Sequence, residues 1–271
     1  MINLQKILKD GKALFLAYDH GMEHGAAEFS AKSSEASREG GTGYIKAVDP
    51  SYILDIAHKG GYTAVILHKG VAEKYYLSWG ADERKCVPLI IKLNGKTSIP
   101  DVEPYSPLVC SVEEAIELGA SAVGYTIYLG SEKESTMLWE FGEVVREAHR
   151  AGIPAIGWIY PRGKWVKERY GSDTNPKVVA YAARVGLELG ADIVKIKYTG
   201  DRKSFAEAVA AAGRTKVVLS GGEKTEKEEE FLQTLKDVMA AGAIGVAVGR
   251  NVWKSRDPLK ITEKIKKTVF S

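Results

Sequence analysis

The chain has 271 residues, 45% of them hydrophobic, and 38 Lys and Arg stand against 35 Asp and Glu, giving a net charge of +3. This small, dispersed charge argues against a nucleic-acid partner but suits a phosphorylated metabolite, and two cysteines are too few for a disulfide framework and fit a reducing, cytoplasmic setting. The N-terminal apolar run is too short for a secretory signal, and no segment approaches a membrane span, so we expect no membrane partner.

Eight short apolar runs have strand character, and helical periodicity fills most intervals between them. In chain order, the predicted strands cover Leu14–Tyr18, Ala64–Leu67, Pro88–Leu93, Ala122–Tyr125, Pro154–Tyr160, Ile193–Lys197, Lys216–Leu219 and Gly245–Val248. The predicted helices cover Pro50–Lys59, Ser111–Leu118, Thr136–Ala151, Pro176–Leu189, Lys203–Ala212, Lys227–Ala241 and Pro258–Val269. Several of these helices end at a glycine that leads into the next strand, a common C-terminal helix signal, at positions 119, 152, 190 and 242.

Alternating strands and helices in this number predict an α/β fold, a single (β/α)8 TIM barrel whose one domain covers residues 1–271. A doubly wound open sheet is the alternative, but no Gly-x-Gly-x-x-Gly turn follows the first strand. Residues 30–48 are polar and rich in Ser, Glu and Gly. They predict a long loop or lid after the first strand, or else a solvated insertion with no role.

The sixth predicted strand carries two lysines, Lys195 and Lys197, which share a face because strand side chains alternate. A buried lysine is costly unless it is paired, neutral or used in chemistry. A desolvated amine loses proton affinity and becomes a nucleophile toward carbonyl groups. The alternative is a pair of ordinary lysines at a strand edge or in salt bridges.

The loops after the seventh and eighth predicted strands both contain glycine. The first reads Ser220, Gly221, Gly222, and the second contains Gly249 and Arg250. Glycines let backbone amides approach an anion, arginine supplies a fixed cation, and barrels often hold phosphate in these two loops. They predict a phosphate site, with two tight turns that bind nothing as the alternative.

Other strand ends add polar and aromatic candidates. Asp19 ends the first strand and can act as a general acid or base or pair with a cationic lysine; an ordinary turn aspartate is the alternative. Trp158 and Tyr160 lie two residues apart on the fifth strand, so both can face the barrel mouth, although core aromatics would follow the same pattern. Tyr160 stands next to Pro161 at the strand's exit, which favours a hydroxyl that reaches the site.

Two segments imitate well-known motifs. His20 to His24 has the His-x-x-Glu-His spacing of some zinc peptidases, but that chemistry needs a helix, and glycines at 21 and 25 predict a loop. The segment 94–97 ends like a phosphate-binding P-loop, yet Ile90 stands where the first glycine is required. We therefore predict neither a metal site nor a nucleotide site.

Taken together, these residues resemble the archaeal-type class I fructose-1,6-bisphosphate aldolases, a Schiff-base branch of the (β/α)8 barrels. The resemblance covers nearly the whole chain. It is carried by Leu16–Gly25, Val71–Tyr76, Lys92–Thr97, Val123–Tyr128, Trp158–Gly163, Lys195–Asp201, Ser220–Gly222 and Val248–Trp253.

The resemblance implies reversible cleavage of fructose 1,6-bisphosphate, with no cofactor, by a cytoplasmic homo-oligomer expected to be a decamer. It selects Lys195 over Lys197 as the imine-forming lysine, a choice that strand periodicity cannot make. It assigns acid and base roles to Asp19 and Tyr160. The implied substrate-binding residues are Trp158, Ser220, Gly221, Gly222, Gly249, Arg250, Lys197 and His24.

Two alternative functions remain open at this stage. The 2-amino-3,7-dideoxy-D-threo-hept-6-ulosonate synthases use the same barrel and lysine and are similar in residues 160–163 and 248–251, but they lack Trp158 and the segment 92–97. The other alternative is a phosphate-binding barrel without covalent chemistry, either an isomerase or an inactive scaffold. The combination of Lys195, Asp19 and Tyr160 argues against it.

Overall fold

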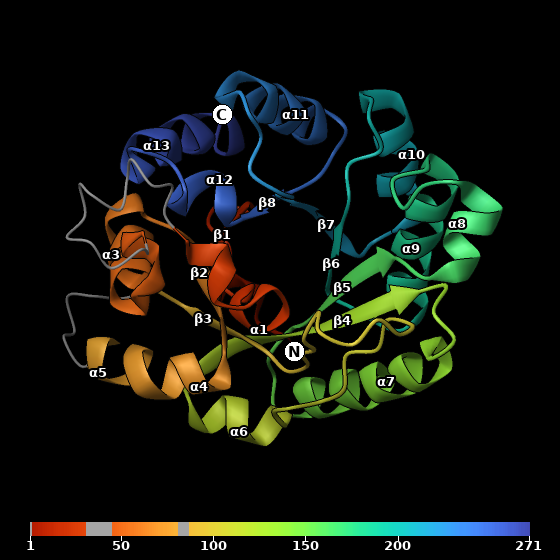
Figure 1. The fold of residues 1–271 in the computed structure, drawn as a ribbon, viewed down its shortest axis with the longest axis horizontal. Coiled ribbons are helices and arrows are strands. Elements are labelled where there is room, and N and C mark those ends of the chain that lie inside the picture. Colours follow the sequence, from red (N-terminus) through yellow and green to blue (C-terminus); the bar gives the residue numbers. More distant parts are fainter. Residues whose placement is uncertain (1, 31–44, 81–86) are drawn as a thin grey trace.

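The computed structural model describes residues 2–30, 45–80 and 87–271, so residues 31–44 of the predicted lid lie outside the described residues. Eight parallel strands close a barrel in which each strand pairs with the next in sequence and β8 pairs with β1 (Figure 1). The strands are β1 (Ala13–Ala17), β2 (Ala64–His68), β3 (Leu89–Lys92), β4 (Ala120–Leu129), β5 (Ala155–Pro161), β6 (Ile193–Ile196), β7 (Lys216–Ser220) and β8 (Gly245–Val248). The predicted fold class is confirmed.

Helices surround the barrel and cover its outer face (Figure 1). The α-helices are α1 (Gly21–His24), α3 (Pro50–Gly60), α4 (Lys69–Val71), α5 (Leu77–Gly80), α6 (Val112–Glu117), α7 (Glu134–Arg150), α8 (Lys164–Tyr170), α9 (Pro176–Glu188), α10 (Arg202–Ala211), α11 (Glu228–Ala240), α12 (Arg250–Trp253) and α13 (Pro258–Val269). Short 3-10 turns cover Leu4–Lys6, Ala26–Phe29 and Lys46–Val48, and a π-helical turn covers Ala72–Tyr76. Within the described ranges, no helix is both long and apolar enough to cross a membrane.

The helix ends follow the capping chemistry in the sequence. Ser111 and Glu114 form a reciprocal capping box at the start of α6. The glycines that close α6, α7, α9 and α11 all have left-handed φ angles, between 75° and 100°, which explains why glycine recurs at these junctions. The short helices α1, α8 and α12 escaped prediction because four to seven residues carry too little periodicity.

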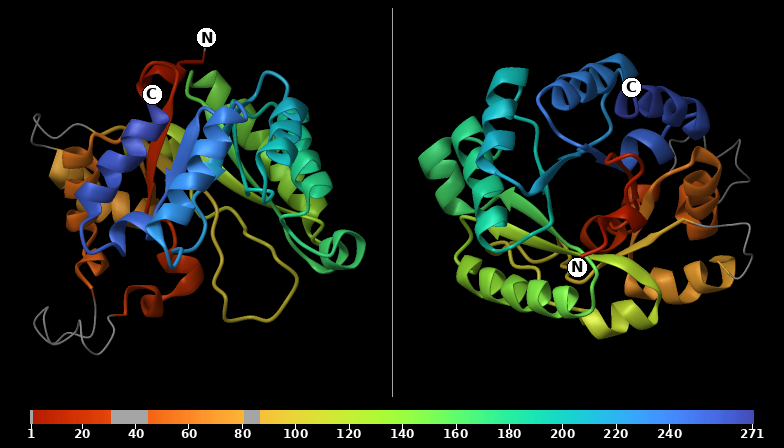
Figure 2. Two further views of the ribbon diagram at one scale, coloured as in Figure 1. Left: turned by 90° about the horizontal axis from the view of Figure 1, so that it is seen from above. Right: turned by 180° about the vertical axis from the view of Figure 1, so that it is seen from behind.

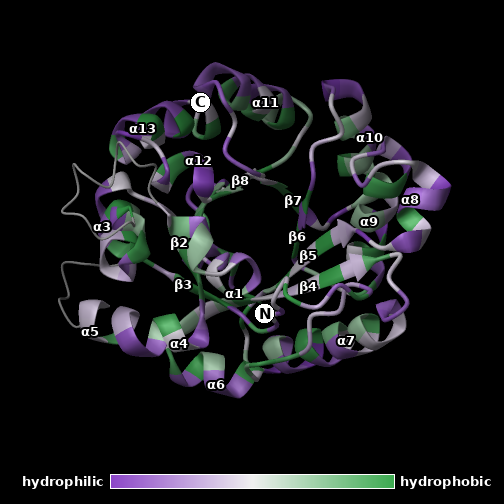
Figure 3. Ribbon diagram, viewed as in Figure 1, coloured by the Kyte–Doolittle hydropathy of each residue, from purple (hydrophilic) through white to green (hydrophobic). Residues whose placement is uncertain are grey.

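The strand period divides the apolar residues into two cores. Leu14 and Leu16 of β1 face the helices, whereas Phe15 and Ala17 face the barrel interior. Figure 3 shows the corresponding pattern on the outer helices, with hydrophobic residues gathered on their inner sides. The interior series places Lys92 and Lys195 near the carboxyl ends of β3 and β6 and, two residues past β1, Asp19 at the same mouth of the barrel.

That mouth lies at the end opposite both chain termini, and the loop between β3 and α6 projects beyond it (Figure 2). Asn94 fixes the start of this loop, because its buried amide donates to the carbonyls of Ser106 and Thr126, both at 2.8 Å, and its Oδ1 accepts from the N–H of Thr126. Glu140 of α7 holds the other end by accepting from the Tyr105 hydroxyl at 2.8 Å. The loop is thus fastened to the barrel at both ends.

Candidate active site

A cavity of about 500 Å³ opens at the carboxyl ends of the strands, a size typical of small-molecule sites. All the catalytic and substrate-binding residues predicted from the sequence line it. They come from six different parts of the barrel, the ends of β1 and β5 to β8 and the helix α1. The structure therefore brings together residues that lie more than 200 positions apart in sequence, from Asp19 to Arg250.

Lys195 lies at the centre of this arrangement. Its residue is 5% exposed, and its Nζ lies 5.1 Å from the centroid of the Trp158 ring, on the strand beside it. Burial lowers the pKa of Lys195 to about 8, with Asp19 opposing the shift and Arg250 adding to it. About a tenth of a lysine with this pKa is neutral at pH 7, which is enough for it to act as a nucleophile.

Lys197 shares the cavity face with Lys195, as the strand period predicts, but its environment differs. β6 ends at Ile196, so the Lys197 side chain lies at the cavity rim and is 27% exposed. Its Nζ forms an ion pair with the carboxylate of Asp173. Burial thus separates two lysines that periodicity could not, and it favours Lys195 as the reactive one.

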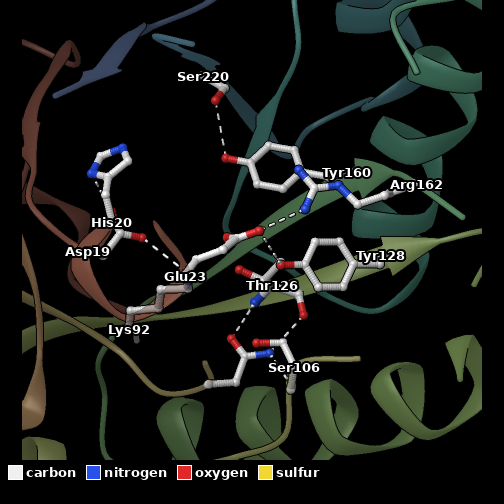
Figure 4. Close-up of polar contacts among 11 residues, drawn as sticks. Asp19, His20, Glu23, Lys92, Ser106, Thr126, Tyr128, Tyr160, Arg162 and Ser220 are labelled. Atoms are coloured by element: carbon white, nitrogen blue, oxygen red, sulfur yellow. Dashed lines mark hydrogen bonds and ion pairs between the residues drawn. The ribbon is translucent and has the colours of Figure 1, made fainter. Parts of the chain in front are cut away.

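Asp19 faces Lys195 from β1 and pairs with a second buried lysine, Lys92 of β3, at 3.4 Å (Figure 4). Burial opposes ionisation of Asp19, but Lys92 and Lys195 outweigh it, and the pKa of Asp19 falls well below its usual value. Asp19 is therefore an anion throughout the neutral range. Sequence reasoning missed Lys92, although a lysine two residues after Ile90 in an apolar strand is the same signal that marked Lys195.

The prediction of a loop at His20 to His24 is wrong, because Gly21–His24 forms the one-turn helix α1 and the two imidazole rings stack at 6.4 Å. His20 Nδ1 lies 3.8 Å from Asp19, and burial lowers the pKa of His20 to about 4, so this ring is neutral. His24 lines the cavity, as expected. Among the residues whose placement is known, no group of three or more His, Cys, Asp or Glu side chains is arranged to hold a metal ion.

Tyr160 stands on the other side of the cavity, at the exit of β5. Its hydroxyl lies 3.1 Å from the Ser220 hydroxyl (Figure 4), and burial raises its pKa well above the ordinary value. The phenol is therefore protonated at neutral pH. Two positions before it, Trp158 is 1% exposed and forms part of the barrel interior beneath Lys195.

The two glycine-containing loops meet beside Lys195. A Cβ at Gly221 would lie 2.9 Å from the carbonyl oxygen of Ala247, and a Cβ at Gly249 would lie 2.5 Å from that of Ala17, so both positions exclude side chains. Asn251 ties the loops together by donating to the Gly221 carbonyl at 3.0 Å. Among the residues that the structure describes, the buried Arg250 Nε has no hydrogen-bond partner, and the guanidinium makes a weak contact, at 3.9 Å, with an exposed glutamate. This is the donor set that a phosphate needs.

A second arginine, Arg162, lines the opposite wall and was not singled out from the sequence. Arg162 follows β5, donates to the Glu23 carboxylate at 2.8 Å and stacks over the Tyr128 ring at 4.9 Å (Figure 4). The residues that Arg162 contacts come from α1 and β4, so this cluster could not be predicted from the sequence around Arg162 alone. Arg250 and Arg162 thus give the cavity one arginine on each of two walls.

Comparison with known proteins agrees with this geometry. The model of the DeoC/LacD family of aldolases matches residues 13–255. The chain is 48% identical over 267 residues to "Fructose-bisphosphate aldolase class 1" of Thermoproteus tenax, covering 98% of this chain and 93% of that protein.

Solved structures give the same result. An archaeal fructose-1,6-bisphosphate aldolase described with its catalytic lysine bound to a carbinolamine intermediate is 46% identical, with a TM-score of 0.85 over 100% of this chain and 97% of that one. A Schiff-base-forming fructose-1,6-bisphosphate aldolase described by its reaction intermediates is also 46% identical, with a TM-score of 0.86 over 98% and 97% of the two chains.

A barrel with a buried, partly neutral lysine at its mouth is typical of an imine-forming aldolase, and the chain belongs to the DeoC/LacD aldolase family. Within that family its similarity is to the class 1 fructose-bisphosphate aldolases, over nearly the full length of both chains. The resemblance drawn from the sequence is confirmed.

Proposed function

We propose that this chain reversibly cleaves fructose 1,6-bisphosphate into dihydroxyacetone phosphate and glyceraldehyde 3-phosphate through an imine on Lys195, with no cofactor or metal. One observation carries the proposal: the buried amine of Lys195, with its pKa lowered to about 8, adjoins loops suited to a phosphate. The reaction named for the Thermoproteus tenax relative, at 48% identity, supports the same substrate.

In the first step, the neutral Nζ of Lys195 attacks the ketone carbon, and the resulting carbinolamine loses water to give a protonated imine. The imine is an electron sink for cleavage of the adjacent carbon–carbon bond. Asp19, held ionised by Lys92 at 3.4 Å, relays the proton that the attacking amine loses to the carbinolamine oxygen, which takes a second proton from solvent and leaves as water. Asp19 is an anion again once the proton has passed on, so it acts as a transient base and then as the counter-ion of the imine.

In the second step, the bond between carbons 3 and 4 breaks as the hydroxyl on carbon 4 loses its proton. We assign this proton exchange to Tyr160, whose hydroxyl contacts Ser220 at 3.1 Å. Burial keeps the phenol protonated in the free enzyme, so it is ready to donate to the alkoxide in the condensation direction. In the cleavage direction, Tyr160 must first release its own proton to solvent, and the positive charge of the imine stabilises the phenolate that then accepts the proton of the carbon-4 hydroxyl.

The two phosphates of the substrate would occupy opposite walls of the cavity. The ketone-side phosphate fits the amides of Gly221, Gly222 and Gly249 and the unpartnered Nε of Arg250. This grip holds the carbonyl carbon against Lys195. The far phosphate lies within reach of His24 and Lys197, together with the newly identified Arg162, all of which line the same cavity.

The direct test is a coupled assay of fructose 1,6-bisphosphate cleavage, with heptulosonate synthesis measured in parallel. The proposal expects cleavage in the wild type, loss of several orders of magnitude in Lys195→Met, and retained imine chemistry in Lys197→Met, since Lys197 is the matched lysine on the same face. Synthesis of the heptulosonate without cleavage would contradict the proposal.

We also propose that the enzyme serves glycolysis and gluconeogenesis in the cytoplasm as a homo-oligomer, with the decamer expected from the family resemblance. The low cysteine count supports a reducing setting. Light scattering after size exclusion tests the assembly. A mass about ten times the 29.5 kDa of one chain is expected, and a monomer at micromolar concentration would contradict it.

A further inference from the structure

Trp158 fills the barrel interior below Lys195 without any polar anchor. Its side chain is 1% exposed, and its indole Nε1 is buried with no hydrogen-bond partner among the described residues. A buried indole N–H usually finds an acceptor, which then fixes the plane of the ring. Here only the surrounding atoms hold the ring in its orientation.

The neighbouring strand provides the space that the ring occupies. Gly124 of β4 lies in the interior series between Ala122 and Thr126, and a Cβ built on it would overlap atoms Cζ3 and Cη2 of Trp158 and lie 2.7 Å from Cε3. Its φ angle is not positive, so the backbone does not require glycine. A glycine inside a strand weakens it and often marks a close approach by another group.

This inference rests on the proposed role of Lys195: we propose that Gly124 is a positioning residue for the reaction, because its missing side chain lets the edge of the Trp158 ring approach β4 closely beneath the Lys195 amine. The argument joins three residues from three adjacent strands. Trp158 pairs in register with Lys195 on β6 on one side, and its ring covers Gly124 on β4 on the other. A side chain at 124 would displace the Trp158 ring, and the cavity that the ring lines together with Lys195 is free space into which it can move.

Moving the ring changes the reacting amine in two ways. The ring face now lies 5.1 Å from Nζ and excludes water from beneath it. A displaced ring admits water or obstructs the approach of the carbonyl carbon, and misplacement of about 1 Å in such a site costs about 100-fold in rate. The residue at 124 therefore controls both the geometry and the solvation of Lys195 without touching the substrate.

The test compares Gly124→Ala with Trp158→Leu and with the double variant Gly124→Ala/Trp158→Leu. We expect Gly124→Ala to lower kcat by about 10- to 100-fold with KM changed by less than about 3-fold. The pH midpoint of borohydride-trapped adduct formation should rise by about one unit, toward that of a hydrated lysine. Gly157→Ala is the matched control, because its Cβ would point away from the site and meet Ile159 and Phe141 at 3.3–3.4 Å.

The double variant tests whether Gly124→Ala acts through displacement of the Trp158 ring and not through another effect on β4. Once Trp158 is a leucine, the methyl group at 124 has no indole ring to displace, so the double variant should match Trp158→Leu in kcat within about 2-fold and should have the same pH midpoint. If Gly124→Ala alone does not fold, the double variant should still fold. Additive losses, a wild-type midpoint in Gly124→Ala, or an unfolded double variant would each overturn the proposal. A wild-type enzyme that forms no adduct on Lys195 would instead refute the proposed function.

Discussion

Removing the carboxylate of Asp19 should lower the pH at which Lys195 reacts, even as it slows turnover. The shift of the Lys195 pKa from 10.5 to about 8 corresponds to about 3 kcal/mol of preference for the neutral amine. Burial produces this preference, and Asp19 opposes it by stabilising the ammonium. In Asp19→Asn the opposing charge is lost, so the Lys195 pKa should fall further, by about one unit.

A second effect acts in the same direction. Lys92 lies 3.4 Å from Asp19 with a side chain only 8% exposed. In Asp19→Asn this buried cation has no carboxylate to neutralise it, which further disfavours a second ammonium at Lys195. Turnover should nevertheless fall, because the base and counter-ion of the imine-forming step are gone.

The assay is the rate of borohydride trapping with dihydroxyacetone phosphate, measured across pH. The wild type should show a midpoint near pH 8 and Asp19→Asn a midpoint about one unit lower. Asp173→Asn serves as the control, because that carboxylate pairs with Lys197 at the rim, and its midpoint should stay near that of the wild type. A midpoint in Asp19→Asn that is unchanged or higher would refute the electrostatic account of the site.

Three further outcomes follow from the same geometry. Arg250→Ala should lower kcat/KM for fructose 1,6-bisphosphate, mainly through KM, by an amount equivalent to about 2–3 kcal/mol of transition-state binding free energy. The loss should be smaller for fructose 6-phosphate, because that substrate lacks the ketone-side phosphate. An equal loss on both substrates would show that this phosphate does not bind at Arg250. Tyr160→Phe should lower cleavage by about 100- to 10,000-fold yet still form the trapped adduct on Lys195, and loss of trapping would give Tyr160 an earlier role. Activity should persist in EDTA because the imine supplies the electron sink, and a metal-reversible loss would point to a metal mechanism instead.

The fold could be predicted because each strand is a continuous apolar run bounded by turn residues. All eight predicted strands are present, and β4 differs most, extending to Leu129 because it pairs with β5 over seven positions. The one-turn helices α1 and α12 could not be predicted because tertiary contacts, and not periodicity, form them. The error at α1 arose from treating its flanking glycines as loop signals.

For the candidate site, too, some residues could be predicted from the sequence and others could not. Asp19, Tyr160 and Arg250 were identified because each lies at or just past the end of a strand, and strand ends meet at one mouth of a barrel. Lys195 was marked as a candidate by its place within an apolar strand, and only the family resemblance distinguished it from Lys197. The contacts between side chains on different strands could not be predicted from the sequence. The partner of Asp19 comes from β3, and the glycine that accommodates Trp158 comes from β4, so both depend on a register that no single segment encodes.

The central claim is that Lys195 carries the covalent intermediate, and peptide mapping tests it most directly. The enzyme is treated with dihydroxyacetone phosphate and borohydride and digested, and the modified lysine is located by mass spectrometry. Lys195, Lys197 and Lys92 all line the same cavity and are the three candidates. The account predicts a single stable adduct on Lys195 that is absent in Lys195→Met. An adduct on Lys197 or Lys92, or none in an enzyme that still cleaves fructose 1,6-bisphosphate, would contradict it.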